Sequence, residues 1–145
     1  MILNSIEFKD KLGVAISNST DEIQIYSAFI TDSALNWALE LANHSNISIV
    51  ARWQKRDIIC GASNVSCYNT CRELGIPFGI NLDLHGKVFC VDDYIFIGSA
   101  NLTSKGLALT ANHNIEFGVG FEAGVADQNK IRGLQKEILW LNSEI

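Results

Sequence analysis

The sequence predicts an α/β sandwich with a central mixed β-sheet, formed as one domain by residues 1–145. Segments with the helical spacing of apolar residues alternate with short segments rich in β-branched and aromatic residues, which is typical of a sheet covered by helices. Hydrophobic residues make up 48% of the 145-residue chain. The chain is therefore long enough and apolar enough to bury its own core, and no Pro- or Ser-rich linker divides it.

The first half of the chain predicts two helices and two strands. Asn4 and Glu7 have the spacing of a capping box, and a helix is expected from there to about residue 19. Its apolar face is made by Phe8, Leu12 and Ile16. Residues 22–30 (EIQIYSAFI) predict a buried strand. Asp32 is expected to cap a second helix, and residues 47–53 (ISIVARW) predict a second strand.

The second half begins with a third predicted helix. Ser63 or Asn64 is expected to cap it, and Gly75 to end it, because glycine adopts the left-handed conformation that closes many helices. Residues 76–80 (IPFGI) predict a short strand. The segment 87–98 (KVFCVDDYIFIG) predicts a hairpin with two aspartates at its turn.

A further strand is predicted for residues 114–121. Its alternation places Glu116 and Gly118 on one face, and the other face carries Ile115, Phe117 and Val119. A last helix is predicted from about Val125 to Leu141, with one apolar stripe. The stripe consists of Ile131, Leu134, Ile138 and Leu141.

Most of the functional signal lies between His85 and Asn101, in the stretch HGKVFCVDDYIFIGSAN. His85 and Lys87 are two residues apart, so alternation along a strand points the imidazole and the ammonium the same way. A neutral imidazole can attack phosphorus, and a lysine can hold negatively charged oxygens. The hairpin returns the chain so that Asn101 adds an amide donor at the level of His85. These residue types at this spacing predict a phosphate-handling site.

A lone H-x-K would be explained by an ordinary strand-end histidine and a solvated lysine, because short motifs often match by chance. Here four residues and Asp92 follow the H-x-K, and the next strand carries Gly98, Ser99 and Asn101 as G-S-x-N. This pattern resembles the phospholipase D superfamily, whose hallmark is H-x-K-x4-D followed by G-S-x-N. The gap between the aspartate and G-S is five residues here instead of the usual six, which a shorter hairpin absorbs.

The resemblance covers nearly the whole chain and implies both fold and activity. It implies a phospholipase D-like α/β/α sandwich and a phosphodiesterase that needs no metal and no cofactor. The segment GSANLTSKG is similar to the endings of phospholipase D-like nucleases and restriction-enzyme domains. Relatives use two H-x-K motifs, one histidine as nucleophile and the other as general acid. A chain with one motif is therefore expected to complete its centre across the two-fold axis of a homodimer.

The predicted catalytic residues are His85, Lys87, Asn101, Ser99 and Glu116. An imidazole nucleophile needs a carboxylate or carbonyl on its other nitrogen, and Glu116 is the candidate because N-x-E-x-G resembles the corresponding family segment. The alternative is an exposed strand glutamate. Asp92 is expected to be structural, because five residues beyond Lys87 is roughly 16 Å of extended chain. Gly98 is also expected to be structural, ending its strand.

A basic cluster, Arg52, Lys55 and Arg56, follows a strand that should run parallel to the strand with Tyr26 and Ser27. Ligands gather at the carboxyl ends of such strands, so the cluster is expected at the rim of the site. A solvated loop is an equal alternative for Lys55 and Arg56. The predicted substrate-binding residues are Arg52, Lys105, Tyr26 and Ser27.

Composition narrows the classes of function. The net charge of −5 argues against a broad nucleic-acid surface, while a local basic site stays compatible with it. The four cysteines (Cys60, Cys67, Cys71 and Cys90) lack zinc spacing with His44 or His113, which are isolated. Buried thiols are expected, with no disulfide. Early charges exclude a secretory signal peptide, and no apolar run could cross a membrane, so a cytoplasmic location is expected.

The leading function is a metal-independent nuclease acting on DNA or RNA, with DNA preferred, at a homodimeric site. A separate target-recognition or helicase protein could act with it. The first alternative is a phospholipid-cleaving or phosphatidyl-transferring enzyme, but no interfacial helix rich in Lys/Arg and Trp/Phe is present. The second is a non-catalytic nucleic-acid-binding domain with a vestigial site, against which the intact His, Lys, Asn and Glu argue.

Overall fold

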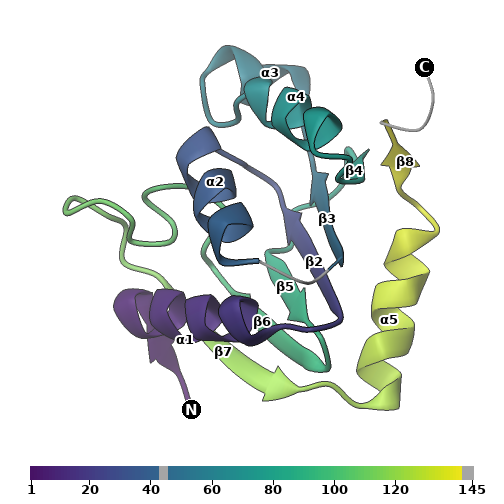
Figure 1. Ribbon diagram of the computed structural model, residues 1–145. Helices are drawn as coiled ribbons and strands as arrows, with labels where there is room; N and C mark the ends of the chain where they lie inside the picture. The colour runs from purple at the N-terminus through teal and green to yellow at the C-terminus, as the bar shows by residue number, and fades with distance from the viewer. Residues whose placement is uncertain (43–45, 142–145) are drawn as a thin grey trace.

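An eight-stranded sheet forms the centre of the molecule, in the order β1-β7-β6-β5-β2-β3-β4-β8 (Figure 1). This computed structural model describes residues 1–42 and 46–141, so His44 lies outside the described residues. The strands are β1 (Leu3–Asn4), β2 (Glu22–Ser27), β3 (Asn46–Ala51), β4 (Phe78–Ile80), β5 (Val88–Val91), β6 (Tyr94–Gly98), β7 (Phe117–Glu122) and β8 (Leu139–Trp140). The helices are α1 (Ser5–Asn18), α2 (Asp32–Leu41), α3 (Lys55–Ile59), α4 (Ser66–Glu73) and α5 (Val125–Gln135).

The sheet is mixed because its two halves are connected differently. β2, β3 and β4 are parallel, and parallel neighbours need crossovers, which α2 and then α3 with α4 supply. β5, β6 and β7 follow one another antiparallel. β5 joins the halves by pairing antiparallel with β2. The predicted α/β sandwich with a mixed sheet is confirmed.

Helices cover both faces of the sheet. One face packs against α1, α2 and α4 through a core that includes Phe8, Leu12, Ile16, Leu35, Cys67, Phe78, Phe89 and Phe96. The opposite face packs against α5 through a second core that includes Tyr26, Val50, Cys90, Ile95, Ile131 and Leu134. Within the described residues, no helix has the length and apolar character needed to cross a membrane.

The capping box predicted at the start of α1 is confirmed. Asn4 Oδ1 accepts a hydrogen bond from Glu7 N–H at 2.9 Å, and Asn4 N–H donates to Glu7 Oε1 at 3.0 Å. Both partners lie within one turn of the chain, so the local sequence was sufficient to predict this cap.

Two other helices start away from their predicted caps. Thr31 takes the N-cap position of α2 instead of Asp32, and α4 begins at Ser66, after Ser63 and Asn64. The side chains of Ser63 and Asn64 accept hydrogen bonds from the backbone N–H groups of Ile30, which precedes α2, and of Asp32, which begins it. They therefore tie two segments together instead of capping their own helix.

Tertiary contacts change the lengths of several predicted elements. β2 ends at Ser27 instead of residue 30, and β7 begins at Phe117 instead of residue 114. α5 ends at Gln135 instead of Leu141, because the chain beyond it pairs with β4 as β8. β1, α3 and β8 are too short to show a periodicity, and the sequence did not predict them.

The four cysteines are free thiols, as predicted. Cys67, Cys71 and Cys90 are buried, whereas Cys60 is exposed, which corrects the prediction that it is buried. Burial raises the pKa of Cys71 and of Cys90 to about 12. These two thiols therefore stay protonated, and they serve the core as small apolar groups.

Candidate active site

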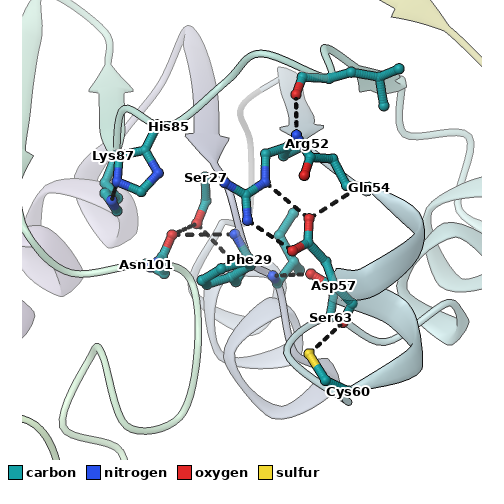
Figure 2. A network of polar contacts seen from close by, with 12 residues as sticks. Ser27, Phe29, Arg52, Gln54, Asp57, Cys60, Ser63, His85, Lys87 and Asn101 are labelled. Carbon is teal, nitrogen blue, oxygen red and sulfur yellow. Dashed lines mark hydrogen bonds and ion pairs between the residues drawn. The ribbon is translucent and has the colours of Figure 1, made fainter.

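The predicted histidine–lysine pair lies at one edge of the sheet, where β2, β3 and β6 end and β5 and β7 begin. His85 and Lys87 immediately precede β5, and His85 Nε2 is 3.4 Å from Lys87 Nζ (Figure 2). His85 is exposed and Lys87 is half-buried. The imidazole is therefore open to a ligand, while the ammonium is held beside it.

The contact between the two side chains favours one tautomer of the histidine. An ammonium has donors only, so the Nε2 of His85 that faces Lys87 acts as an acceptor, and the ring proton then lies on Nδ1. A neutral imidazole in this form has a lone pair on Nε2 that can attack phosphorus. The neighbouring ammonium can turn to a non-bridging phosphate oxygen when one is present.

Asn101 is held in one orientation by the end of β2. Its Oδ1 accepts a hydrogen bond from Phe29 N–H at 3.2 Å and lies 3.2 Å from Ser27 Oγ. A backbone N–H can only donate, so the amide oxygen must face Phe29 and Nδ2 must face the other way. Ser27 is fully buried and also accepts from Leu102 N–H at 2.8 Å. Ser27 therefore supports Asn101, which corrects its predicted contact with substrate.

Tyr26 lies on the opposite face of the sheet. Its side chain is 1% exposed, in the core beneath α5, and its hydroxyl donates to Gln24 Oε1 at 3.1 Å. Burial raises the pKa of Tyr26 to about 12. Successive residues of a strand point to opposite faces, so Tyr26 and Ser27 cannot both face the site. The predicted contact of Tyr26 with substrate is corrected by this placement.

Glu116 is bound to Ser99, not to His85, among the described residues. Ser99 Oγ donates to Glu116 Oε1 at 2.6 Å, and Ser5 Oγ accepts from Glu116 N–H at 2.8 Å. Glu116 is half-buried and immediately precedes β7. His85 precedes β5 and Glu116 precedes β7, and β6 lies between these two strands. An orienting role of Glu116 toward His85 stays a prediction.

Gly98 and Gly118 face each other on β6 and β7, directly before the Ser99–Glu116 contact. A Cβ atom at Gly98 would lie 2.5 Å from the carbonyl oxygen of Phe117. A Cβ atom at Gly118 would lie 2.5 Å from the ring of Phe8. Real side chains do not approach this closely, so glycine allows the two strands and α1 to pack here.

Asp92 lies at the opposite edge of the sheet, in the turn between β5 and β6. Its carboxylate accepts a hydrogen bond from Ser19 Oγ at 2.7 Å and further bonds from the N–H groups of Thr20, Asp21 and Glu22. Burial alone would raise the pKa of Asp92, but these hydrogen bonds together outweigh burial and lower it. Asp92 therefore anchors the segment that leads into β2.

Arg52 directly follows β3 and is 8% exposed. Its Nε and Nη2 donate to Asp57 Oδ2 and Oδ1 at 2.9 and 2.8 Å. The guanidinium carbon lies 4.8 Å from the centre of the Phe29 ring. The hydrogen bond from Arg52 lowers the pKa of Asp57, so the pair is ionised. Arg52 is thus buried and paired with Asp57, which corrects its expected place on an open rim. Its contact with substrate stays a prediction.

The other basic residues predicted near the substrate have exposed side chains. Lys55 and Arg56 open α3 with exposed side chains. Lys105 is also exposed, in a loop that Ser104 N–H fastens to Thr31 Oγ1 at 3.2 Å. None of the three makes a side-chain hydrogen bond or ion pair within residues 1–42 and 46–141, so their part in binding stays a prediction.

An apolar patch borders the site on β6 and β7. The patch consists of Ile97, Ile115, Phe117 and Val119, which are 41%, 85%, 58% and 37% exposed. Ile97 pairs with Val119, and alternation places Phe117 on the same face. The predicted facing of residues 115, 117 and 119 agrees with this exposure. Apolar patches of this kind mark interaction surfaces.

The described residues contain no group of three or more His, Cys, Asp or Glu side chains that could hold a metal ion. The polar groups at the edge of the sheet are instead an imidazole, an ammonium, an amide and one carboxylate. Such a set favours a ligand with negatively charged oxygens over a cation.

Comparison with known sequences decides the family. Residues 12–124 match the family described as the PLD-like domain of cardiolipin synthase. The chain belongs to the phospholipase D superfamily. No curated protein matches it in sequence.

Solved structures share the phospholipase D fold across nearly the whole chain. Nuc, a phospholipase D family member from Salmonella typhimurium, has a TM-score of 0.73 and 17% identity, over 99% of this chain and 97% of Nuc. NucT from Helicobacter pylori has a TM-score of 0.66 and 15% identity, over 97% of this chain and all of NucT. Phosphatidylserine synthase from Haemophilus influenzae has a TM-score of 0.79 and 17% identity, but this chain spans 39% of its length.

Three supporting residues were missed by sequence reasoning. Phe29 fixes the Asn101 amide, Asp57 holds Arg52, and Ser5 anchors the backbone at Glu116. Asp57 had a local signal, because it lies three residues after Gln54 and accepts its N–H at 3.0 Å, as at many helix starts. Phe29 and Ser5 act on residues far away in the sequence, and no local pattern marks them.

Proposed function

We propose that this chain is a metal-independent phosphodiesterase that cleaves nucleic acid, DNA in preference to RNA. The contact between His85 and Lys87, next to the outward amide of Asn101, is the observation that carries this proposal. A nucleophile and two kinds of donor for phosphate oxygens then lie at one edge of the sheet. Membership of the phospholipase D superfamily supports phosphodiester chemistry at these residues.

The reaction would proceed in two displacements. His85 Nε2 attacks phosphorus, a P–N bond forms, and the bond to the leaving oxygen breaks as that oxygen takes a proton from a second histidine. Water then attacks the phosphohistidine, the second histidine takes the proton of the water, and the P–N bond breaks to release a phosphomonoester. Lys87 and Asn101 hold the non-bridging oxygens throughout. Glu116 would accept the Nδ1–H of His85 and stabilise its positive charge.

The second histidine would come from a second copy of the chain. One H-x-K motif is present where the two displacements need two histidines, and the apolar patch at the same edge offers a surface for a two-fold contact. Nuc and NucT, which match this chain almost end to end, are of similar length, whereas the phosphatidylserine synthase is longer. The dimer contact is therefore proposed to bring two copies of His85 together.

Val119→Asp tests this dimer, because it places a charge in the apolar patch beside the site. Light scattering should show a dimer for the wild type and a monomer for Val119→Asp, and activity should be lost with the dimer. Leu139→Asp is the matched control, since Leu139 is 65% exposed on β8 at the other side of the sheet. A fully active wild-type monomer at micromolar concentration would contradict the proposed dimer.

Two observations favour nucleic acid as the substrate. The segment from Gly98 to Gly106 (GSANLTSKG) is similar to the endings of phospholipase D-like nucleases. The exposed Lys55 and Arg56 begin α3, in the connection that follows the strand leading to the site. The second candidate is a phospholipid, because the fold is also that of a phosphatidylserine synthase. A target-recognition or helicase partner stays a prediction.

A cleavage assay tests the function. Single- and double-stranded DNA, RNA and phospholipid vesicles are incubated with the protein, with and without EDTA. We expect cleavage of nucleic acid that EDTA does not reduce, an acid-labile phosphoprotein in rapidly quenched samples, and loss of both in His85→Ala. His113→Ala is the matched control, because it also removes an imidazole. Nδ1 of His113 contacts the carbonyl oxygen of Asn114 at 2.8 Å and none of the proposed catalytic residues. Activity lost with EDTA and restored by magnesium would contradict the scheme.

A further inference from the structure

We propose that Arg52, held by Asp57 and stacked on Phe29, forms a second phosphate subsite beside the proposed reaction centre. The inference rests on the proposed function and makes its substrate class more specific. A polynucleotide has phosphates on both sides of the bond that is cleaved, whereas a phospholipid with one phosphodiester has none. An arginine that binds a second phosphate next to the centre would therefore favour a substrate of the first kind.

The guanidinium of Arg52 has N–H donors that Asp57 does not use, on the side of the reaction centre. Asp57 uses Nε and one N–H of Nη2. Nη1 has no hydrogen-bond partner among the described residues, and 10% of the Arg52 side chain is exposed to solvent. In Figure 2 the edge of the guanidinium that Asp57 does not use faces Ser27 and the histidine–lysine pair.

The surrounding contacts hold this arginine rigidly. Asp57 is buried and also accepts the N–H of Gln54 at 3.0 Å, so the carboxylate is itself fixed. Trp53 adopts a left-handed backbone with φ of 44°, which turns the chain sharply between Arg52 and α3. A residue of this type adopts that conformation only where its surroundings enforce it, and such positions cluster at functional sites. An arginine already fixed loses little conformational entropy when it binds phosphate.

Phe29 links the proposed subsite to the reaction centre. Its ring lies under the Arg52 guanidinium, and its N–H fixes the Asn101 amide. One residue therefore positions a donor for the reacting phosphate and a donor for a neighbouring phosphate. The distance between the two donors is set by the protein, as recognition of a regularly spaced chain of phosphates requires.

The competing explanation is that Arg52 and Asp57 form a purely structural ion pair. A suitable variant distinguishes this explanation from a phosphate subsite. Arg52→Gln alone would leave the Asp57 carboxylate buried without a partner, which destabilises a fold. The double variant Arg52→Gln/Asp57→Asn removes both charges, leaves the net charge unchanged and replaces the pair by two amides. Circular dichroism and thermal unfolding verify that this variant is folded. Arg132→Gln, on an exposed position of α5, controls for the loss of an arginine.

The kinetic test uses nitrophenyl esters of thymidine phosphates in matched pairs. One compound of each pair carries the scissile phosphodiester alone, and the other carries an additional phosphate at the remaining 3′ or 5′ position. In the wild type the extra phosphate should raise kcat/KM on the order of ten- to a hundred-fold in one of the two pairs, as expected for charged hydrogen bonds. The double variant should lose this gain, whereas Arg132→Gln should keep it.

Calorimetric binding of thymidine 3′,5′-bisphosphate and of the two monophosphates gives a readout that does not depend on turnover. We expect the wild type to bind the bisphosphate at least about tenfold more tightly than either monophosphate, and the double variant to bind all three equally. A wild type without preference for the bisphosphate, or a double variant that keeps the preference, would overturn the subsite. Preference without any hydrolysis would support the subsite and refute the proposed catalysis, so the two failures are distinguishable.

Discussion

Asp92→Asn should destabilise the protein without slowing catalysis, although Asp92 belongs to the sequence motif that carries His85 and Lys87. Asparagine tolerates the left-handed φ of 53° at this position. The amide oxygen can still accept hydrogen bonds, but the group has no charge, and its nitrogen cannot accept one. Four hydrogen bonds reach the carboxylate. One of these hydrogen bonds is lost in the variant and the other three weaken. Because Asp92 is solvent-exposed, we expect the free energy of unfolding to fall by about 1–2 kcal/mol.

Thermal unfolding at different pH values measures this loss. At neutral pH the melting temperature should fall by roughly 3–8 °C. The folded pKa of Asp92 lies below the ordinary value of 3.8, so its contribution is fully present above that value and is lost as the pH falls through the folded pKa. The difference in melting temperature between the wild type and Asp92→Asn should therefore disappear at acidic pH.

Asp93→Asn provides the matched control, because it removes the same charge from the same turn. The side chain of Asp93 has no hydrogen bond or ion pair to any described residue. The control should therefore melt close to the wild type, and both variants should keep the wild-type kcat. An equal loss of stability in both variants, or a fall in kcat for Asp92→Asn alone, would refute the structural role.

Three further outcomes are expected. Glu116→Gln should lower kcat by about 10²-fold, less than removal of the nucleophile, because an amide accepts a hydrogen bond but cannot stabilise an imidazolium; unchanged kinetics would leave it an ordinary strand-end glutamate. Gly98→Ala should cost about 1–3 kcal/mol in chemical unfolding, because its Cβ would meet a backbone oxygen at 2.5 Å, whereas Gly133→Ala, which meets nothing within 4 Å, should not. Neutralising Lys55 and Arg56 should weaken DNA binding and reduce its log–log salt slope by up to about 0.9 per lost contact; an unchanged slope would place both off the DNA path.

Sequence reasoning succeeded where the deciding interactions are local. The capping box of Asn4 and Glu7, the hairpin around Asp92, and the proximity of His85 and Lys87 depend on residues at most a few positions apart. The alternation of residues 115, 117 and 119 was also sufficient to predict which of them share a face. These features follow from the geometry of a single helix, turn or strand.

Sequence reasoning was insufficient where the contacts of a residue depend on how separate elements pack together. Ser27 and Tyr26 are adjacent on a strand that is apolar on both faces, so the pattern did not show which of them faces the site. Arg52 was expected on an open rim because Asp57, its partner, lies in a helix of five residues without apolar periodicity. Glu116 contacts Ser99, and its orienting role toward His85 stays a prediction, because it depends on the packing of three strands.

The support of Asn101 has a consequence for how the chain acquires its activity. Phe29 and Ser27 contact Asn101 across separations of 72 and 74 residues. Contacts of such long range close a large loop and cannot form within a local segment. A nascent or partly unfolded chain can contain the whole stretch from His85 to Asn101 and still lack an oriented amide. The proposed activity would then be confined to the fully folded molecule, and its rate would report the native population more strictly than a spectroscopic probe of helix content.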